Sequence, residues 1–181
     1  MLMLRGIGCF VCIVFMVSCT HQTRQQRMAA FINNPENKIV QSIQLGEVRA
    51  TAKWLPDHFQ NGSTDNTPLN SKERIEDYCY FNVKIEKSSI EKPAREKIMY
   101  LNFDMQNDFV VLCGGDSISP VICQKVETGI PGRFEYLVAF RNSNSQLSKN
   151  DFTLYYKDKI FGLGVIAFVY SQKDIRKIPK V

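Results

Sequence analysis

Histidine is the side chain best suited to acid–base chemistry at neutral pH, and the sequence holds only two, His21 and His58. His58 follows Asp57, and a carboxylate beside an imidazole could orient it as a general base. Side chains adjacent in sequence seldom point at each other, however, and no third partner is evident, so a solvated turn histidine is the simpler interpretation. The sequence also lacks a Gly-x-Ser-x-Gly elbow, a His-Glu-x-x-His pair and a phosphate-binding glycine loop. We therefore predict no enzymatic activity.

Carboxylates gather in one stretch, where their oxygens could hold calcium. They are Asp104, Asp108 and Asp116, with Asn102 and Asn107 nearby. The spacing is not that of an EF-hand loop, which needs alternate acidic positions, a central glycine and a closing glutamate. Solvated strand ends explain the same residues, so we predict no metal site and no cofactor.

Cysteine pairing is the next chemistry to weigh, since an oxidising compartment permits disulfides. If the chain reverses near Ile118, Cys113 and Cys123 fall opposite each other on neighbouring strands and could be bonded. Thiols that face a core are also ordinary small apolar residues. Both interpretations stay open, whereas Cys79, between two outward tyrosines, is expected in the core.

Four aromatic residues are candidates for binding. Tyr78, Tyr80 and Tyr155 are expected to point away from the apolar faces of their strands, and Trp54 lies at a strand end beside a long polar loop. Such rings combine apolar area with a polar tip, so they can stack on sugars or anchor a protein interface. Alternatively, they complete strand faces that pack under a loop.

The first residues are typical of a secretory signal. Arg5 is followed by an apolar run of about eleven residues from Ile7 to Val17, which is too short to span a bilayer that needs about twenty. The sequence Met16-Val17-Ser18-Cys19 then resembles the bacterial lipobox, with Met16 in place of the usual leucine. The resemblance implies that residues 1–18 are removed and that Cys19 carries the lipid. Ordinary cleavage after Ser18 with a free Cys19 is the alternative.

The residue after the anchor predicts the destination, by analogy with lipoprotein sorting. Thr20 is not the aspartate that often retains lipoproteins at an inner membrane, and no acidic run follows Cys19. We therefore expect the periplasmic face of the outer membrane.

Two segments follow the lipidated cysteine. Residues 19–45, rich in Gln, Asn and Arg, suit a polar tether with a short helix from Arg24 to Ile32. Residues 46–181 are expected to form the folded domain, because apolar residues there recur with period two, as in half-buried strands. The expected inward-facing residues are Val48, Ala50, Ala52 and Trp54; Cys79, Phe81, Val83 and Ile85; Met99, Leu101, Phe103 and Met105; Phe109, Val111 and Cys113; Val121 and Cys123; Phe134, Tyr136, Val138 and Phe140; and Phe152, Leu154 and Tyr156, before an apolar stretch from Ile160 to Tyr170.

Short strands separated by turn signals predict an all-β fold, an antiparallel immunoglobulin-like β-sandwich of about eight strands. The apolar share of 44% and charged share of 23% fit one globular domain. The net charge of +5 is mild, and basic residues alternate with acids along most of the chain, so we expect no nucleic-acid partner.

Five short segments of the domain carry a resemblance: Trp54-Leu55-Pro56, Tyr100-Leu101-Asn102-Phe103, Phe161-Gly162-Leu163-Gly164, Asp174-Ile175 and Ile178-Pro179. They look similar to segments of small uncharacterised lipoproteins of Bacteroidota. The resemblance implies a likeness over most of the mature domain and brings no known activity. We therefore expect a lipid-anchored, non-catalytic binding or assembly module with an envelope protein or glycan as partner. The alternatives are a subunit of an envelope machine, similar to small sandwich lipoproteins of type VI secretion, and an envelope-polymer hydrolase built on His58, Asp57 and the acidic group.

Overall fold

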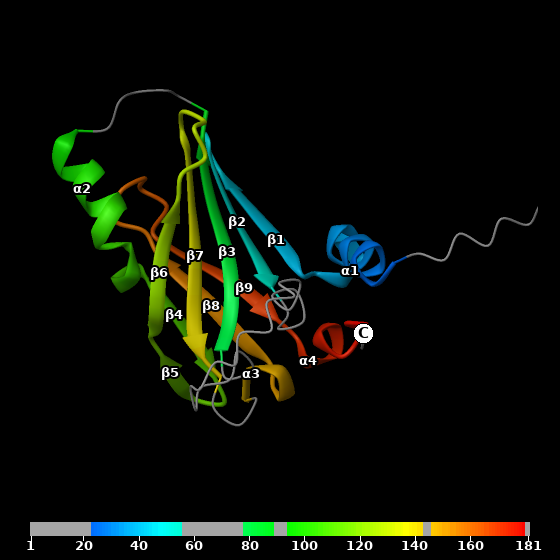
Figure 1. Cartoon of the computed structure of the whole chain (residues 1–181). Coiled ribbons are helices and arrows are strands. Elements are labelled where there is room, and N and C mark those ends of the chain that lie inside the picture. The colour runs from blue at the N-terminus through cyan, green and yellow to red at the C-terminus, as the bar shows by residue number, and fades with distance from the viewer. Residues whose placement is uncertain (1–22, 56–77, 89–93, 143–145, 180–181) are drawn as a thin grey trace, which may run out of the picture.

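Two antiparallel sheets pack face to face in the computed structural model, which describes residues 23–55, 78–88, 94–142 and 146–179 (Figure 1). In spatial order, the five-stranded sheet holds β1 (Val40–Leu45), β2 (Val48–Leu55), β3 (Tyr78–Lys87), β7 (Arg133–Arg141) and β6 (Pro120–Val126). The four-stranded sheet holds β5 (Asp116–Ile118), β4 (Phe109–Cys113), β8 (Phe152–Lys157) and β9 (Val165–Tyr170). The helices are α1 (Arg24–Asn33), α2 (Arg95–Phe103), α3 (Gln146–Lys149) and α4 (Gln172–Ile175), with 3-10 turns η1 (Pro35–Asn37) and η4 (Met105–Asp108).

The strand order is that of an immunoglobulin sandwich. If β2 to β9 are lettered A, B, C, C′, D, E, F and G in chain order, one sheet runs A-B-E-D and the other C′-C-F-G. Every described pairing is antiparallel. The predicted sandwich is therefore confirmed, and β1 adds a ninth strand beside β2.

The core forms where the inward faces of the two sheets meet. Alternation holds along β3 and β8, which bury every second side chain. Phe81 of β3 contacts Phe140 of β7 at 5.7 Å between ring centroids and Phe152 of the opposite sheet at 5.9 Å. These T-shaped contacts join both layers, and such ring pairs stabilise a fold beyond their buried area.

The tether predicted for residues 19–45 was wrong for the part that the structure describes. The short helix is confirmed as α1, but its apolar residues Met28 and Ile32 are buried, as is Ile39, and β1 pairs with β2 along its whole length. Thr23 and Gln26 cap the helix reciprocally, with 2.9 Å and 3.3 Å hydrogen bonds. The folded domain therefore includes α1 and β1, because Met28, Ile32 and Ile39 belong to its buried core.

Side chains close the sandwich along one side. Gln41 of β1 donates to the backbone carbonyl of Val169 at 2.6 Å and accepts from its N–H at 3.1 Å, so its amide imitates a strand partner for the edge of β9. The buried Tyr170 hydroxyl donates to the Ala52 carbonyl at 3.1 Å. The two Gln41 bonds occupy backbone groups at the edge of β9 that could otherwise pair with a strand of another chain.

The strand predicted from Met99 to Met105 was also wrong, since the segment forms α2 and η4. The alternating residues divide into two pairs with a spacing of four, which is the helical spacing. Leu101 and Met105 are buried against the sandwich, whereas Met99 and Phe103 face solvent. Propensity favoured this outcome, because Ala94 to Lys97 consists of helix-forming residues.

Candidate binding surface

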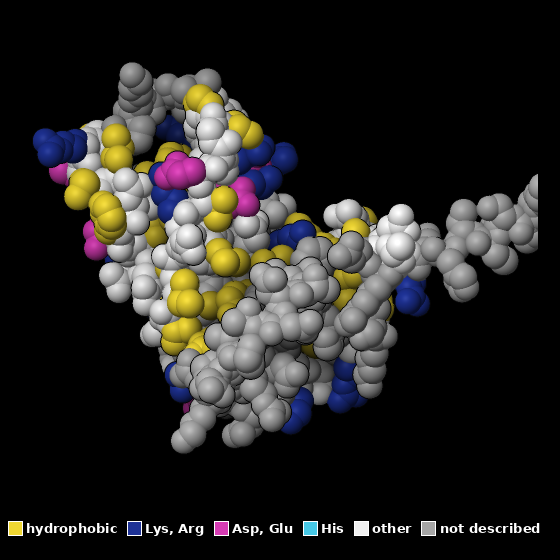
Figure 2. Space-filling model, in the orientation of Figure 1, with side chains coloured by type: hydrophobic (Ala, Val, Ile, Leu, Met, Phe, Trp, Pro, Cys, Tyr) yellow, Lys and Arg dark blue, Asp and Glu magenta, His cyan; other side chains and the backbone are white. Residues whose placement is uncertain are grey.

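The exposed side of α2 is the most apolar helical surface in the described chain. Three of its nine residues are large, apolar and exposed: Ile98, Met99 at 50% and Phe103 at 71%. Figure 2 shows yellow side chains gathered on this helix at the upper left. We call Ile98, Met99 and Phe103 the α2 face. Phe and Met are enriched in protein interfaces, so this face has the composition of a binding surface.

A cluster of three polar side chains fixes α2 to the sandwich. The Tyr100 hydroxyl donates to Asp108 Oδ1 at 2.6 Å, and Lys159 Nζ lies 2.9 Å from the same oxygen and 3.0 Å from the Tyr100 hydroxyl. Lys159 also sits over the Tyr100 ring, 5.5 Å from its centroid. The Asp108 side chain is fully buried, and its second oxygen has no hydrogen-bond partner. The cluster joins α2, η4 and the turn after β8, which holds the α2 face in one position.

Protonation in this cluster does not suit Lys159 or Tyr100 as a general base. Hydrogen bonds to Tyr100 and then to Asp108 raise the pKa of Lys159, and burial followed by the bond to Asp108 raises the pKa of Tyr100. Both groups therefore stay protonated at neutral pH. A general base needs the opposite, a pKa near the operating pH.

A second contact attaches the far end of α2 to the edge strand β6. Lys125 of β6 donates to Asn102 Oδ1 at 3.0 Å and forms a 2.9 Å ion pair with Glu127. The Gln106 side chain of η4 donates to the Pro120 carbonyl, also at 3.0 Å. The α2 face thus lies on a helix that is anchored to both sheets, as a preorganised interface requires.

The turn that carries Lys159 is held by one carboxylate. Asp158 accepts hydrogen bonds from the backbone N–H groups of Ile160, Phe161 and Leu163 at 2.7 to 3.0 Å and from the Tyr156 hydroxyl at 2.8 Å. Burial raises the pKa of Asp158, but these bonds outweigh it and lower the pKa below its usual value. The folded state therefore favours the ionised carboxylate.

This balance predicts an effect of Asp158→Asn that depends on pH. A carboxyl group with a lowered folded pKa stabilises the fold above its unfolded pKa of about 3.9, and that stability is lost as pH falls through the folded value. Near neutral pH, Asp158→Asn should cost about 1 to 3 kcal/mol in urea unfolding, because charge-assisted bonds are lost. The difference from the native protein should narrow at about pH 2. Asp104→Asn, at an exposed position, should change stability by less than about 0.5 kcal/mol. A loss of stability in Asp158→Asn that is the same at both pH values would contradict the role of the ionised Asp158 carboxylate.

The predicted aromatic candidates do not form one surface. Trp54 is buried in the core, where its ring makes T-shaped contacts with Phe152 at 5.8 Å and Tyr170 at 6.3 Å, so it is not exposed for binding. Tyr78 and Tyr80 are half-buried on the outer face of β3, with ring centroids 6.3 Å apart. Tyr155 is half-buried on the outer face of β8, in the other sheet. The tyrosines therefore face opposite sides of the sandwich.

No disulfide joins Cys113 and Cys123, a pairing that the sequence left open, since both carry free thiols. Cys113 pairs with Asp116 and Phe152 in the four-stranded sheet, whereas Cys123 lies opposite Val138 in the five-stranded sheet. The chain reverses at Gly114-Gly115 and crosses between sheets after β5, so the two strands are not neighbours. Burial, and then the Asp108 carboxylate, raise the pKa of Cys123 to about 12. A thiol held protonated in this way is a poor nucleophile.

The three acids considered for calcium are separate in space. Asp108 is bound by Lys159 and Tyr100, Asp104 is exposed, and Asp116 accepts from Gln146 at 3.3 Å. Within the described ranges, no group of three His, Cys, Asp or Glu residues could hold a metal ion.

Other predicted residues lie outside the described part of the chain. They are Cys19, His21, Asp57 and His58. Among the residues that are described, no helix is long and apolar enough to cross a membrane.

The structure resembles a protein of known structure, whereas the sequence comparisons find no relative. No protein-family model matches the chain, and no curated protein matches it. A solved structure of a DUF4426 family protein from Pseudomonas aeruginosa PAO1 is similar, with 14% sequence identity and a TM-score of 0.39. The match covers 74% of this chain and 92% of that one.

The α2 face is the candidate binding surface that sequence reasoning missed. The alternation from Met99 to Met105 was interpreted as a buried strand, which placed Met99 and Phe103 in the core. The signal that could have found the face is the helix-forming run from Ala94, together with the spacing of four between those two residues.

Proposed function

We propose that the chain is a lipid-anchored lipoprotein of the bacterial envelope that acts as a non-catalytic binding or assembly module. The lipobox-like sequence ending at Cys19 supports the anchor, and Thr20 supports the periplasmic face of the outer membrane. The likeness of several segments to small uncharacterised lipoproteins of Bacteroidota is in accord with both. Several acyl chains on one cysteine give the stable membrane attachment that a single chain cannot.

The α2 face carries the proposed binding role. Its apolar side chains are exposed, yet the helix beneath them is fixed by the Tyr100–Asp108–Lys159 cluster and by Lys125. A fixed apolar surface loses little conformational entropy on association. Ile98 and Met99 offer no hydrogen bonds to sugar hydroxyls, so a protein partner fits this face better than a glycan.

A photo-crosslinking amino acid at Phe103 tests this role in native envelopes. It should give one discrete protein adduct, because the ring at this position would be buried by the partner. A crosslinker at Val165 of β9 is the matched control, since that apolar residue is similarly exposed, 65% against 71% for Phe103, and should give none.

Two results would contradict the proposal. One is the absence of an adduct at Phe103, and the other is the same adducts at both positions. Adding Met99→Ser should weaken the Phe103 adduct at least about fivefold, since an interface residue that is buried on binding contributes roughly 1 kcal/mol or more.

A further inference from the structure

We propose that the end of the domain formed by α1, η1 and α4 binds the anionic headgroups of phospholipids, so that the domain rests directly on the bilayer. The inference rests on the proposed acylation of Cys19 for its placement, and on the charges of the described residues for its chemistry. We call the exposed cations Arg27, Lys38, Lys173, Arg176 and Lys177 the basic end.

Most of the net charge of the chain lies here. Residues 23–38 and 172–179 hold six Lys and Arg against two acids, whereas the whole chain has a net charge of +5. The two segments are far apart in sequence, but α1 and α4 lie side by side in Figure 1, far from α2. Dark blue side chains appear around them at the right of Figure 2.

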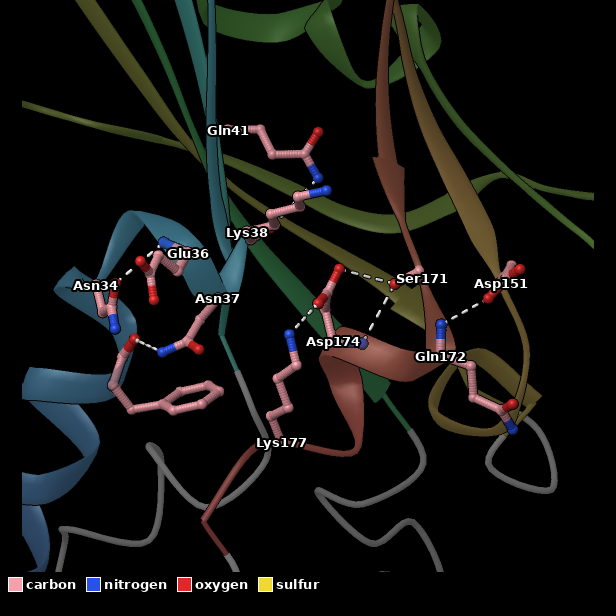
Figure 3. A network of polar contacts seen from close by, with 11 residues as sticks. Asn34, Glu36, Asn37, Lys38, Gln41, Asp151, Ser171, Gln172, Asp174 and Lys177 are labelled. Atoms are coloured by element: carbon pink, nitrogen blue, oxygen red, sulfur yellow. Dashed lines mark hydrogen bonds and ion pairs between the residues drawn. The ribbon is translucent and has the colours of Figure 1, made fainter.

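The two acids of this end, Glu36 and Asp174, offset only part of the charge of its six cations. Asp174 bonds to Lys177 at 2.6 Å and to Ser171 at 2.8 Å, and bonds to these two residues, with a smaller contribution from Lys38, lower its pKa (Figure 3). Asp151 of the neighbouring turn accepts the Gln172 backbone N–H at 2.6 Å. Lys173 of α4 and Arg176 directly after it are exposed and form no ion pair with an acid of the described chain, so they are available to an external anion.

The short segment between the proposed anchor and the domain would keep this surface close to the membrane. Four residue steps separate Cys19 from Thr23, the residue that caps α1. Even fully extended, four steps reach about 14 Å. An acylated Cys19 would therefore keep α1 within one or two Debye lengths of the headgroups, where surface charges still interact. The end that must lie nearest the bilayer is the end that carries the cations.

Anionic phospholipid is the ligand that this arrangement fits. Each lysine or arginine near an anionic surface contributes roughly a fivefold gain in membrane affinity, and a lipid anchor adds to such a basic surface. With the basic end on the membrane, α2 lies on the opposite side of the domain, which leaves its apolar face toward the compartment.

Vesicle binding of a chain that begins at Thr20 tests the surface without the acyl anchor. That chain keeps every helix and strand that the structure describes, so the sandwich is complete. The probe is a vesicle of phosphatidylglycerol and phosphatidylethanolamine, compared with phosphatidylethanolamine and phosphatidylcholine. The chain should cosediment with the anionic vesicles alone, and binding should fall as salt is raised.

Two charge-matched variants locate the binding. Lys173→Gln/Arg176→Gln should weaken binding about 25-fold, whereas Arg95→Gln/Lys97→Gln, which removes two exposed cations from α2, should weaken it less than about threefold. Equal losses in both variants, or no preference for anionic vesicles, would overturn the proposal. Because no acyl chain is present, neither result depends on whether Cys19 is lipidated.

Discussion

Phe140→Ala should lower the free energy of unfolding by about 3 to 5 kcal/mol. Phe140 is 0% exposed, lies on β7 between β3 and β6, and packs edge-on against Phe81 at 5.7 Å. Removing the ring forfeits its transfer free energy and leaves a cavity that rigid strands on both sides prevent from closing. A small domain has only about 5 to 15 kcal/mol of stability, so this change takes a large part of it.

The measurement is urea unfolding followed by fluorescence and circular dichroism. Val165→Ala is the control, because this side chain is 65% exposed on the outer face of β9 and its truncation should cost less than about 0.5 kcal/mol. Similar losses in the two variants would contradict the placement of β7 at the centre of the sandwich.

Ile32→Ala should cost about 2 to 4 kcal/mol, an effect that a flexible tether could not produce. Ile32 lies in α1, is 2% exposed and belongs to the same buried cluster as the strands. Its truncation leaves a void where the helix docks, and part of the loss is α1 detaching from the sandwich.

Asn33→Ala provides the comparison on the same helix. Asn33 is exposed, so its substitution should change stability by less than about 0.5 kcal/mol. If Ile32→Ala changed stability as little as Asn33→Ala, α1 would contribute nothing to the fold. The segment would then be a flexible tether, as the sequence predicts.

Strands whose two faces differ in polarity could be predicted from sequence. Along β3, Cys79, Phe81, Val83 and Ile85 alternate with polar or amphipathic residues, and the buried face follows that pattern. Such strands predict the sandwich from sequence, because a period of two in apolar residues is typical of half-buried strands.

Local periodicity failed where tertiary contacts decide the outcome. Edge strand β1 has no regular period-two pattern, since its apolar residues are Val40, Ile43 and Leu45, yet its backbone bonds to β2 hold it in the sheet. Likewise, the crossing between sheets after β5 separates Cys113 from Cys123, and no pattern within the sequence marks which sheet the next strand joins.

The candidate binding surface could be anticipated only in part. Tyr78 and Tyr155 do lie on outer strand faces, as their alternation predicts. Phe103 was missed because its exposure depends on α2 docking through Leu101, and the Asp108–Lys159 ion pair that fixes the helix joins residues 51 positions apart. Contacts of that range are set by the assembled sandwich.

The mass of the protein extracted from native membranes tests the central claim most directly, because the proposed attachment of the domain to the envelope depends on a lipid at Cys19. Intact mass spectrometry should show a chain that starts at Cys19 and carries diacylglycerol with or without a further acyl chain, and Cys19→Ser should incorporate no labelled palmitate. A chain that starts at Cys19 with an unmodified thiol, or labelled fatty acid still attached to the Cys19→Ser variant, would contradict a lipid-anchored module.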